Sequence, residues 1–99
     1  MACIDVDALT QFEADAERGR ADALYNLGLA YSTGQGVGVD FVAAHKWFNL
    51  AAVKGNREAV RLRREIADQM SESEIAAAQR AARDWLKGGG GSPAPAFAA

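Results

Sequence analysis

The chain is poor in the residues that most often carry chemistry, since its 99 residues include one cysteine, Cys3, and one histidine, His45. A single cysteine excludes an intrachain disulfide and leaves too few soft ligands for a four-ligand zinc site. Cys3 precedes the first predicted helix, and nothing in the spacing brings it to His45 to form a catalytic pair. We therefore predict no enzyme, no metal and no cofactor, and we interpret His45 as an exposed surface residue.

The sequence also lacks membrane and calcium signals. No run of 18 apolar residues is present, and the acidic N-terminal stretch has no basic region followed by an apolar one, which favours a soluble, cytoplasmic protein. Five carboxylates gather near the start but lack the interior glycine and terminal glutamate of a calcium loop. We interpret them as capping and solubilising residues: Asp5, Asp7, Glu13, Asp15 and Glu17.

The charges that are present are unevenly distributed around a net charge of −2. Residues 1–40 carry seven acidic groups against two arginines, whereas residues 41–99 carry nine basic groups against six acidic ones. Such asymmetry can favour head-to-tail association or an acidic partner, although solvated helix surfaces are its commoner cause.

Apolar residues recur at helical spacing over five segments, so the sequence predicts an all-α fold. Polar residues suited to N-capping stand at the start of four of the segments, including Asp5 or Asp7 at the first and a capping box at Ser71 and Glu74, and Gly19 and Gly55 are placed to end two of them. We expect Trp47 and Phe48 to anchor the core, so that Trp47→Ala would unfold the domain. The predicted helices span residues 7–18, 21–33, 41–54, 57–70 and 72–87.

Residues 34–40, with the sequence GQGVGVD, form a glycine-rich corner between the second and third predicted helices. Glycine reaches positive φ angles easily, and Asp40 can cap the helix that follows. A phosphate-binding loop would instead need a preceding strand and a Gly-Lys-Ser/Thr sequence, both of which are missing. We interpret the corner as a structural turn.

Residues 88–99 differ in composition from the rest of the chain, with the sequence GGGGSPAPAFAA. Glycine freedom, two prolines and one large apolar residue cannot offset the entropy cost of packing. We predict a helical domain over residues 1–87 and a disordered tail over residues 88–99; a laboratory linker and a natural low-complexity end are equally compatible with this tail.

A shift of 36 residues aligns Phe12 with Phe48 and Gly19 with Gly55 without a gap, and Ala16 and Ala23 align with alanines in the same way. A fixed period of this length, built from helix pairs, indicates units that cover one another's apolar faces.

Residues 23–59 contain Leu27-Gly28, Gly34-x-Gly36-Val37 and Trp47-Phe48. These motifs closely resemble the Sel-one-like repeat (SLR) family, an αα-hairpin relative of tetratricopeptide repeats. The resemblance covers one complete repeat, from Ala23 to Ala59, and implies a short right-handed αα superhelix (solenoid) that acts as a protein-binding scaffold or adaptor, frequently in bacterial proteins. The residues that carry it, or that we expect to be structural, are Leu27, Gly28, Tyr31, Gly34, Gly36, Trp47, Phe48, Gly55 and Trp85.

Two positions depart from the family pattern. Ala43 stands where the family often has lysine, and Gly38 stands where it usually has proline. One complete repeat is also fewer than the three that usually make a solenoid stable. Either the terminal helices cap it unusually well, or its open ends associate, for example in a homodimer.

We expect partner binding on residues that point away from the core. Tyr25, Leu29 and Ser32 lie opposite the predicted core face of the second helix, and the 36-residue shift maps them to Arg61, Glu65 and Asp68 on the fourth. Together they would form a half-apolar, half-charged groove for a peptide or helix. The alternative, rated equally, is that Tyr25 and Leu29 only cover the first helix or a dimer contact.

The arginines of residues 57–64 offer a second function, binding of nucleic acid or another anion. Against it, Arg61 with Glu65 and Arg80 with Asp84 have the spacing of i,i+4 ion pairs, and no aromatic residues are interleaved to stack on bases. We therefore favour solvated helix faces over a nucleic-acid site.

Overall fold

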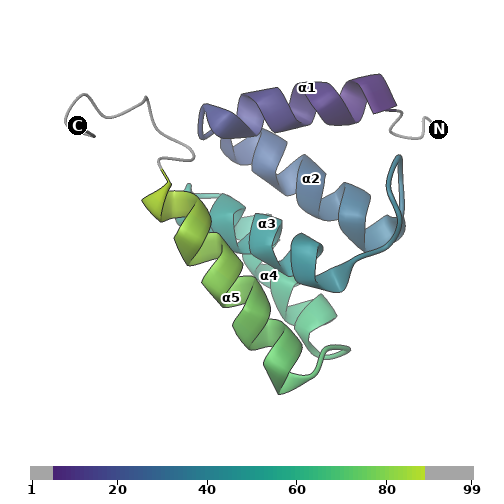
Figure 1. Cartoon of the computed structure of the whole chain (residues 1–99), viewed down its shortest axis with the longest axis vertical. Helices are drawn as coiled ribbons and strands as arrows, with labels where there is room; N and C mark the ends of the chain where they lie inside the picture. Colours follow the sequence, from purple (N-terminus) through teal and green to yellow (C-terminus); the bar gives the residue numbers. More distant parts are fainter. Residues whose placement is uncertain (1–5, 89–99) are drawn as a thin grey trace.

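The computed structural model describes residues 6–88, and all of its regular structure is helical (Figure 1). Each helix follows the previous one after a short connection, and the longest connection is the glycine-rich corner at residues 34–40. The helices are α1 (Val6–Glu17), α2 (Ala21–Thr33), α3 (Phe41–Val53), α4 (Arg57–Ala67) and α5 (Glu72–Lys87).

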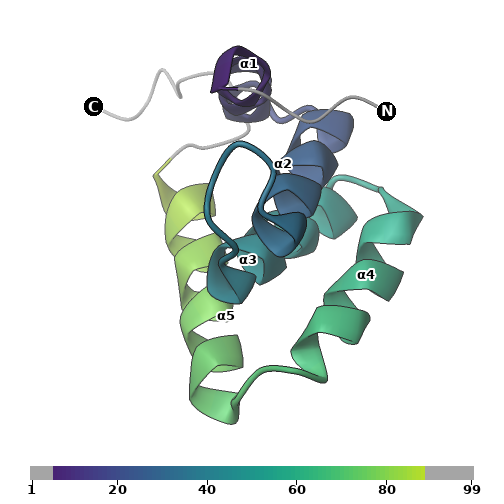
Figure 2. The ribbon, with the colours of Figure 1, turned by 90° about the vertical axis from the view of Figure 1, so that its right-hand side faces the viewer.

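α3 is the central element of the packing. It contacts α2, α4 and α5, whereas α1 packs on α2. Figure 2 shows α4 and α5 on opposite sides of α3, with α1 above α2 at the far end of the molecule. The result is a short stack of helix pairs, as the sequence predicts.

Side-chain caps fix where three of the helices begin. The carboxylate of Asp40 accepts a hydrogen bond from the Ala43 amide at 3.0 Å, and the Asn56 side chain accepts one from the amide of Ala59 at 2.9 Å. At α5 the Ser71 hydroxyl and the Glu74 carboxylate each accept from the other residue's amide. These caps satisfy amides that have no partner inside the helix, so the starts of α3, α4 and α5 are encoded locally.

The core is built from small and aliphatic side chains around one aromatic ring. Phe48, Leu24, Leu27 and Leu50 are fully buried, and alanines from all five helices surround the larger side chains. Alanine lets helices approach closely, and at Gly28 of α2 the Phe48 ring of α3 lies against the bare backbone. Phe48 therefore links the two helices of the central hairpin.

The corner at residues 34–40 is held by its backbone. Gly34 and Gly36 have φ angles of 78° and 80°, which an L-side chain rarely adopts. The Asp40 amide donates to the Tyr31 carbonyl at 2.9 Å, and Val37 packs against the core. The corner thus returns the chain from α2 to α3 as a turn.

Four predictions need correction. The fourth helix ends at Ala67 instead of residue 70, and the residues after it form turns. His45 is buried at 4% exposure, because its position on α3 faces neighbouring helices. Trp47 is only half-buried, so Phe48 alone is the fully enclosed aromatic anchor. Arg80 and Asp84 both lie exposed on α5 without forming the expected ion pair.

The predicted tail lies almost wholly outside the described residues. Of residues 88–99 the structure describes only Gly88, whose amide donates to the Asp84 carbonyl at 2.9 Å and closes α5. Cys3 also lies outside the described part of the chain.

Candidate protein-binding surfaces

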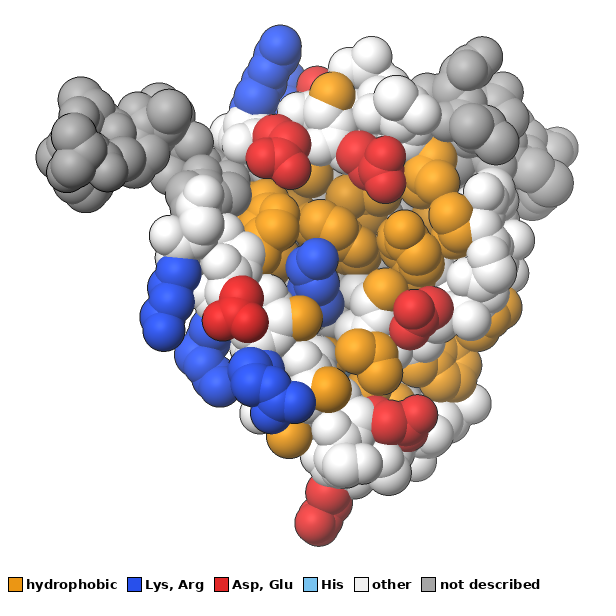
Figure 3. All heavy atoms as spheres, viewed as in Figure 1, with side chains coloured by type: hydrophobic (Ala, Val, Ile, Leu, Met, Phe, Trp, Pro, Cys, Tyr) orange, Lys and Arg blue, Asp and Glu red, His pale blue; other side chains and the backbone are white. Residues whose placement is uncertain are grey.

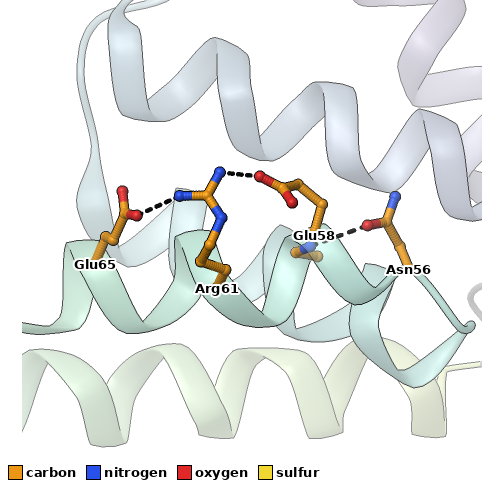
Figure 4. A network of polar contacts seen from close by, with 5 residues as sticks. Asn56, Glu58, Arg61 and Glu65 are labelled. Atoms are coloured by element: carbon orange, nitrogen blue, oxygen red, sulfur yellow. Dashed lines mark hydrogen bonds and ion pairs between the residues drawn. The ribbon is translucent and has the colours of Figure 1, made fainter.

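The exposed side of α4 carries an arginine held between two carboxylates. Arg61 pairs with Glu58 one turn before it and with Glu65 one turn after it, the latter at 2.5 Å. Figure 4 shows these three side chains in a row on α4, pointing towards the side on which α2 lies. This row presents alternating negative and positive charges along the exposed side of α4.

The predicted residues on α2 are half-buried and do not form a fully exposed face. The Tyr25 ring lies 5.9 Å from the Phe48 ring, centroid to centroid, and Leu29 also packs against the core. The Leu29 carbonyl accepts a hydrogen bond from the hydroxyl of Ser32 at 3.1 Å. Tyr25 and Leu29 therefore contribute to packing and still offer part of their surface to solvent.

The structure places α2 and α4 as separate neighbours of α3. Asp68, the last of the six predicted residues, is exposed as the C-cap residue of α4. We use the name α2–α4 face for the six predicted residues on these two helices: Tyr25, Leu29, Ser32, Arg61, Glu65 and Asp68.

Comparison with known families decides what the central hairpin is. The family model of the Sel1 repeat matches residues 21–56, which run from the first residue of α2 to the N-cap of α4. Residues 21–56 are a Sel1 repeat. A search of curated protein sequences returned no match.

Sel1 repeats are in general protein–protein interaction modules and are typically non-catalytic. In this chain the Sel1 repeat supplies the α2 half of the α2–α4 face, and the arginine row lies just beyond the match on α4. No helix among the described residues is long and apolar enough to cross a membrane.

The arginines that follow the Sel1 repeat do not form one continuous cationic patch. Arg61 is neutralised by its two carboxylates, and half-buried Arg63 donates a hydrogen bond to the Asn49 side chain at 2.6 Å. Arg57 and Arg64 remain exposed. Because two of the four arginines are engaged in this way, the positive electrostatic potential that would attract a phosphate backbone is much reduced.

His45 lies inside the Sel1 repeat, and no group of metal-ligating side chains among the described residues surrounds it. Its Nδ1 atom is buried without a hydrogen-bond partner. Burial lowers the pKa of His45, and the nearby positive charge of Arg63 lowers it further. Within residues 6–88 no group of three or more histidine, cysteine or carboxylate side chains is placed to hold a metal ion.

A second surface, which the sequence did not reveal, lies where α1, α3 and α5 meet. It is an open groove of about 530 Å³ lined by Thr10, Glu13, Ala14 and Glu17 of α1, Lys46 and Trp47 of α3, and Trp85 of α5. Figure 3 shows this side of the molecule, where apolar side chains gather in a hollow bordered by charged ones. We call it the tryptophan groove.

The sequence predicted Trp47 in the core and Trp85 as a structural residue, so neither was expected to line a groove. Their rings pack edge to face, with centroids 5.9 Å apart and planes at 81°. Lys46 lies over the Trp47 ring, its Nζ atom 4.1 Å from the ring centroid. The available signal was Glu13 and Glu17, one helical turn apart on the first helix, but only the packing of α1 on α2 and of α5 on α3 brings them near two aromatic rings.

Proposed function

We propose that this chain is a non-enzymatic adaptor that binds a peptide or helix of a partner protein on the α2–α4 face. The family match supports the general class, because Sel1 repeats generally mediate protein–protein interactions. The observation that carries the choice of face is the row of Glu58, Arg61 and Glu65, an exposed pattern of alternating charge on α4.

The face combines this charged row with the half-exposed parts of Tyr25 and Leu29. Aromatic and aliphatic groups supply contact area, and the charges supply orientation and partner choice. A bacterial partner and a cytoplasmic setting, which the family resemblance and the sequence suggest, belong to this proposal.

The test exchanges two charges and keeps their ion pair. Arg61→Glu combined with Glu65→Arg reverses the pattern presented to a partner and preserves an attractive i,i+4 pair. It also replaces the pair with Glu58 by a like-charge contact, so we expect the helicity to be kept and the stability to fall by less than about 1 kcal/mol. The same exchange on α5, Arg80→Glu with Asp84→Arg, is the matched control. Each intact chain is used to capture proteins from extracts of its own cell, followed by identification of what is bound.

We expect a specific protein to be captured by the parent and by the α5 control and to be lost from the α4 exchange. Equal capture by all three chains would contradict the assignment to this face. Capture of nucleic acid in place of protein, with a steep salt dependence, would contradict the protein-binding function itself.

A further inference from the structure

One side of the tryptophan groove is lined by carboxylates that form no ion pair within the described residues. These are Glu13 and Glu17, which are exposed and line the groove from α1. The one cation in the lining is Lys46, which is engaged with the Trp47 ring. Burial lowers the pKa of Lys46, and the charge of Glu17 opposes that shift. The groove therefore carries a net negative charge along one side.

The other side is aromatic. Trp47 and Trp85 are half-buried, and both contribute to the groove lining. Lys46 lies over the Trp47 ring, and the half-exposed parts of the two indole rings offer apolar surface against which a flat group such as a proline ring can pack. Aromatic-lined grooves bind proline-rich segments in this way because the polyproline II conformation loses little entropy on binding.

The size of the groove favours a short extended segment. An α-helix with its side chains is about 10–12 Å across, so about 530 Å³ corresponds to roughly one turn. A longer helix would rest on the rim, whereas an extended segment can place one residue against the tryptophans and the next along α1.

We propose that the tryptophan groove binds an extended segment of a partner protein in which proline precedes arginine or lysine. The proline packs against Trp47 and Trp85, and the basic side chain pairs with Glu13 and Glu17. This site lies on α1, α3 and α5, so it is separate from the α2–α4 face and stands or falls independently of it.

The tryptophans make occupancy directly measurable, because Trp47 and Trp85 are the two tryptophans of the chain. The probe is a blocked synthetic peptide in which an alanine–proline run is followed by two arginines; a second peptide carries glutamates in place of the arginines. Each is titrated into the full chain while tryptophan emission is recorded, at low and at physiological salt. We expect saturable binding of the arginine peptide, weakened by salt, and at least about tenfold weaker binding of the glutamate peptide.

Two variants of equal net charge locate the site. Glu13→Gln combined with Glu17→Gln raises the net charge by two, as does Glu72→Lys at the start of α5. We expect the first variant to bind the arginine peptide with about tenfold lower affinity, and the second with less than about twofold lower affinity. The thermal melt of each variant is recorded alongside, and the α4 exchange Arg61→Glu/Glu65→Arg should leave peptide affinity unchanged.

Three results would overturn the proposal. The first is the absence of saturable binding, or equal loss of affinity in both charge variants. The second is a dimer, detected by sedimentation, that dissociates on changing Glu13 and Glu17, since a second copy would then occupy the groove. The third is a shift in tryptophan emission of the free chain when Pro93, Pro95 and Phe97 are replaced by serine, since the chain's own end would then be the occupant.

Discussion

Gly28 of α2 lies directly against the ring of Phe48 on α3. A Cβ atom built on Gly28 would stand 2.5 Å from two ring carbons of a side chain that is itself 1% exposed. The ring cannot move aside without disturbing its neighbours, since protein interiors are close-packed. The glycine thus sets the distance between the two helices of the Sel1 repeat.

Gly28→Ala should therefore destabilise the protein although alanine is the better helix former. The gain in helix propensity is about 1 kcal/mol, and overpacking costs about 1–3 kcal/mol, so we expect a net loss of up to about 2 kcal/mol. Urea unfolding followed by circular dichroism measures this loss. Gly38→Ala is the control, because a Cβ there meets nothing within 4 Å; an unchanged midpoint for Gly28→Ala would show that the helices can separate freely.

The two adjacent aromatic residues of α3 should differ in their contribution to stability. Phe48→Ala removes a fully buried ring and should cost about 3–5 kcal/mol, comparable to the whole stability of a small domain. Trp47→Ala removes a half-buried ring at the groove and should cost roughly 1–3 kcal/mol, leaving a cooperative melt. Thermal melts of both variants test the ranking, and the reverse order would mean that Trp47 is the true anchor.

His45 should make stability depend on pH. Its pKa in the folded chain is lowered from the ordinary value of 6.5, because burial and the charge of Arg63 disfavour the protonated ring. The unfolded chain consequently binds the proton first as the pH falls. The stability is complete above about pH 6.5 and declines as the pH drops towards the lower folded pKa.

We expect the urea midpoint of the parent to fall between pH 7.5 and pH 5.5, a window above most carboxylate titrations. His45→Leu removes the titrating group from the buried position, so its midpoint should stay nearly constant over the same window. A parallel decline in both proteins would assign the pH dependence to other groups.

The caps of α4 and α5 should each contribute about 1 kcal/mol. Asn56→Ala leaves the Ala59 amide without its side-chain acceptor, and Ser71→Ala breaks the capping box with Glu74. Urea unfolding of each variant measures the cost, with Asn56→Asp as a control that retains an acceptor oxygen. A loss from Asn56→Asp as large as that from Asn56→Ala would show that capping is not the cause.

The sequence by itself determined the local structure of this protein. The five helices follow from 3.6-residue periodicity, and their starts at Asp40, Asn56 and Ser71 follow from side chains that bond amides within three residues. The Sel1 repeat was recognisable for the same reason, since its glycines and alanines recur at fixed short spacing. The same short-range reasoning placed the end of α4 three residues too late.

Only the tertiary structure decided which faces of the helices are covered. His45 is enclosed and Trp47 is partly open because α4 and α5 both pack on α3, an arrangement set by contacts between residues far apart in the chain. The tryptophan groove depends on such contacts too, since the packing of α1 on α2 and of α5 on α3 joins Glu13, Trp47 and Trp85 from three helices. Helical periodicity predicts which side chains lie on the same face of a helix. Whether that face is buried depends on which other helix packs against it.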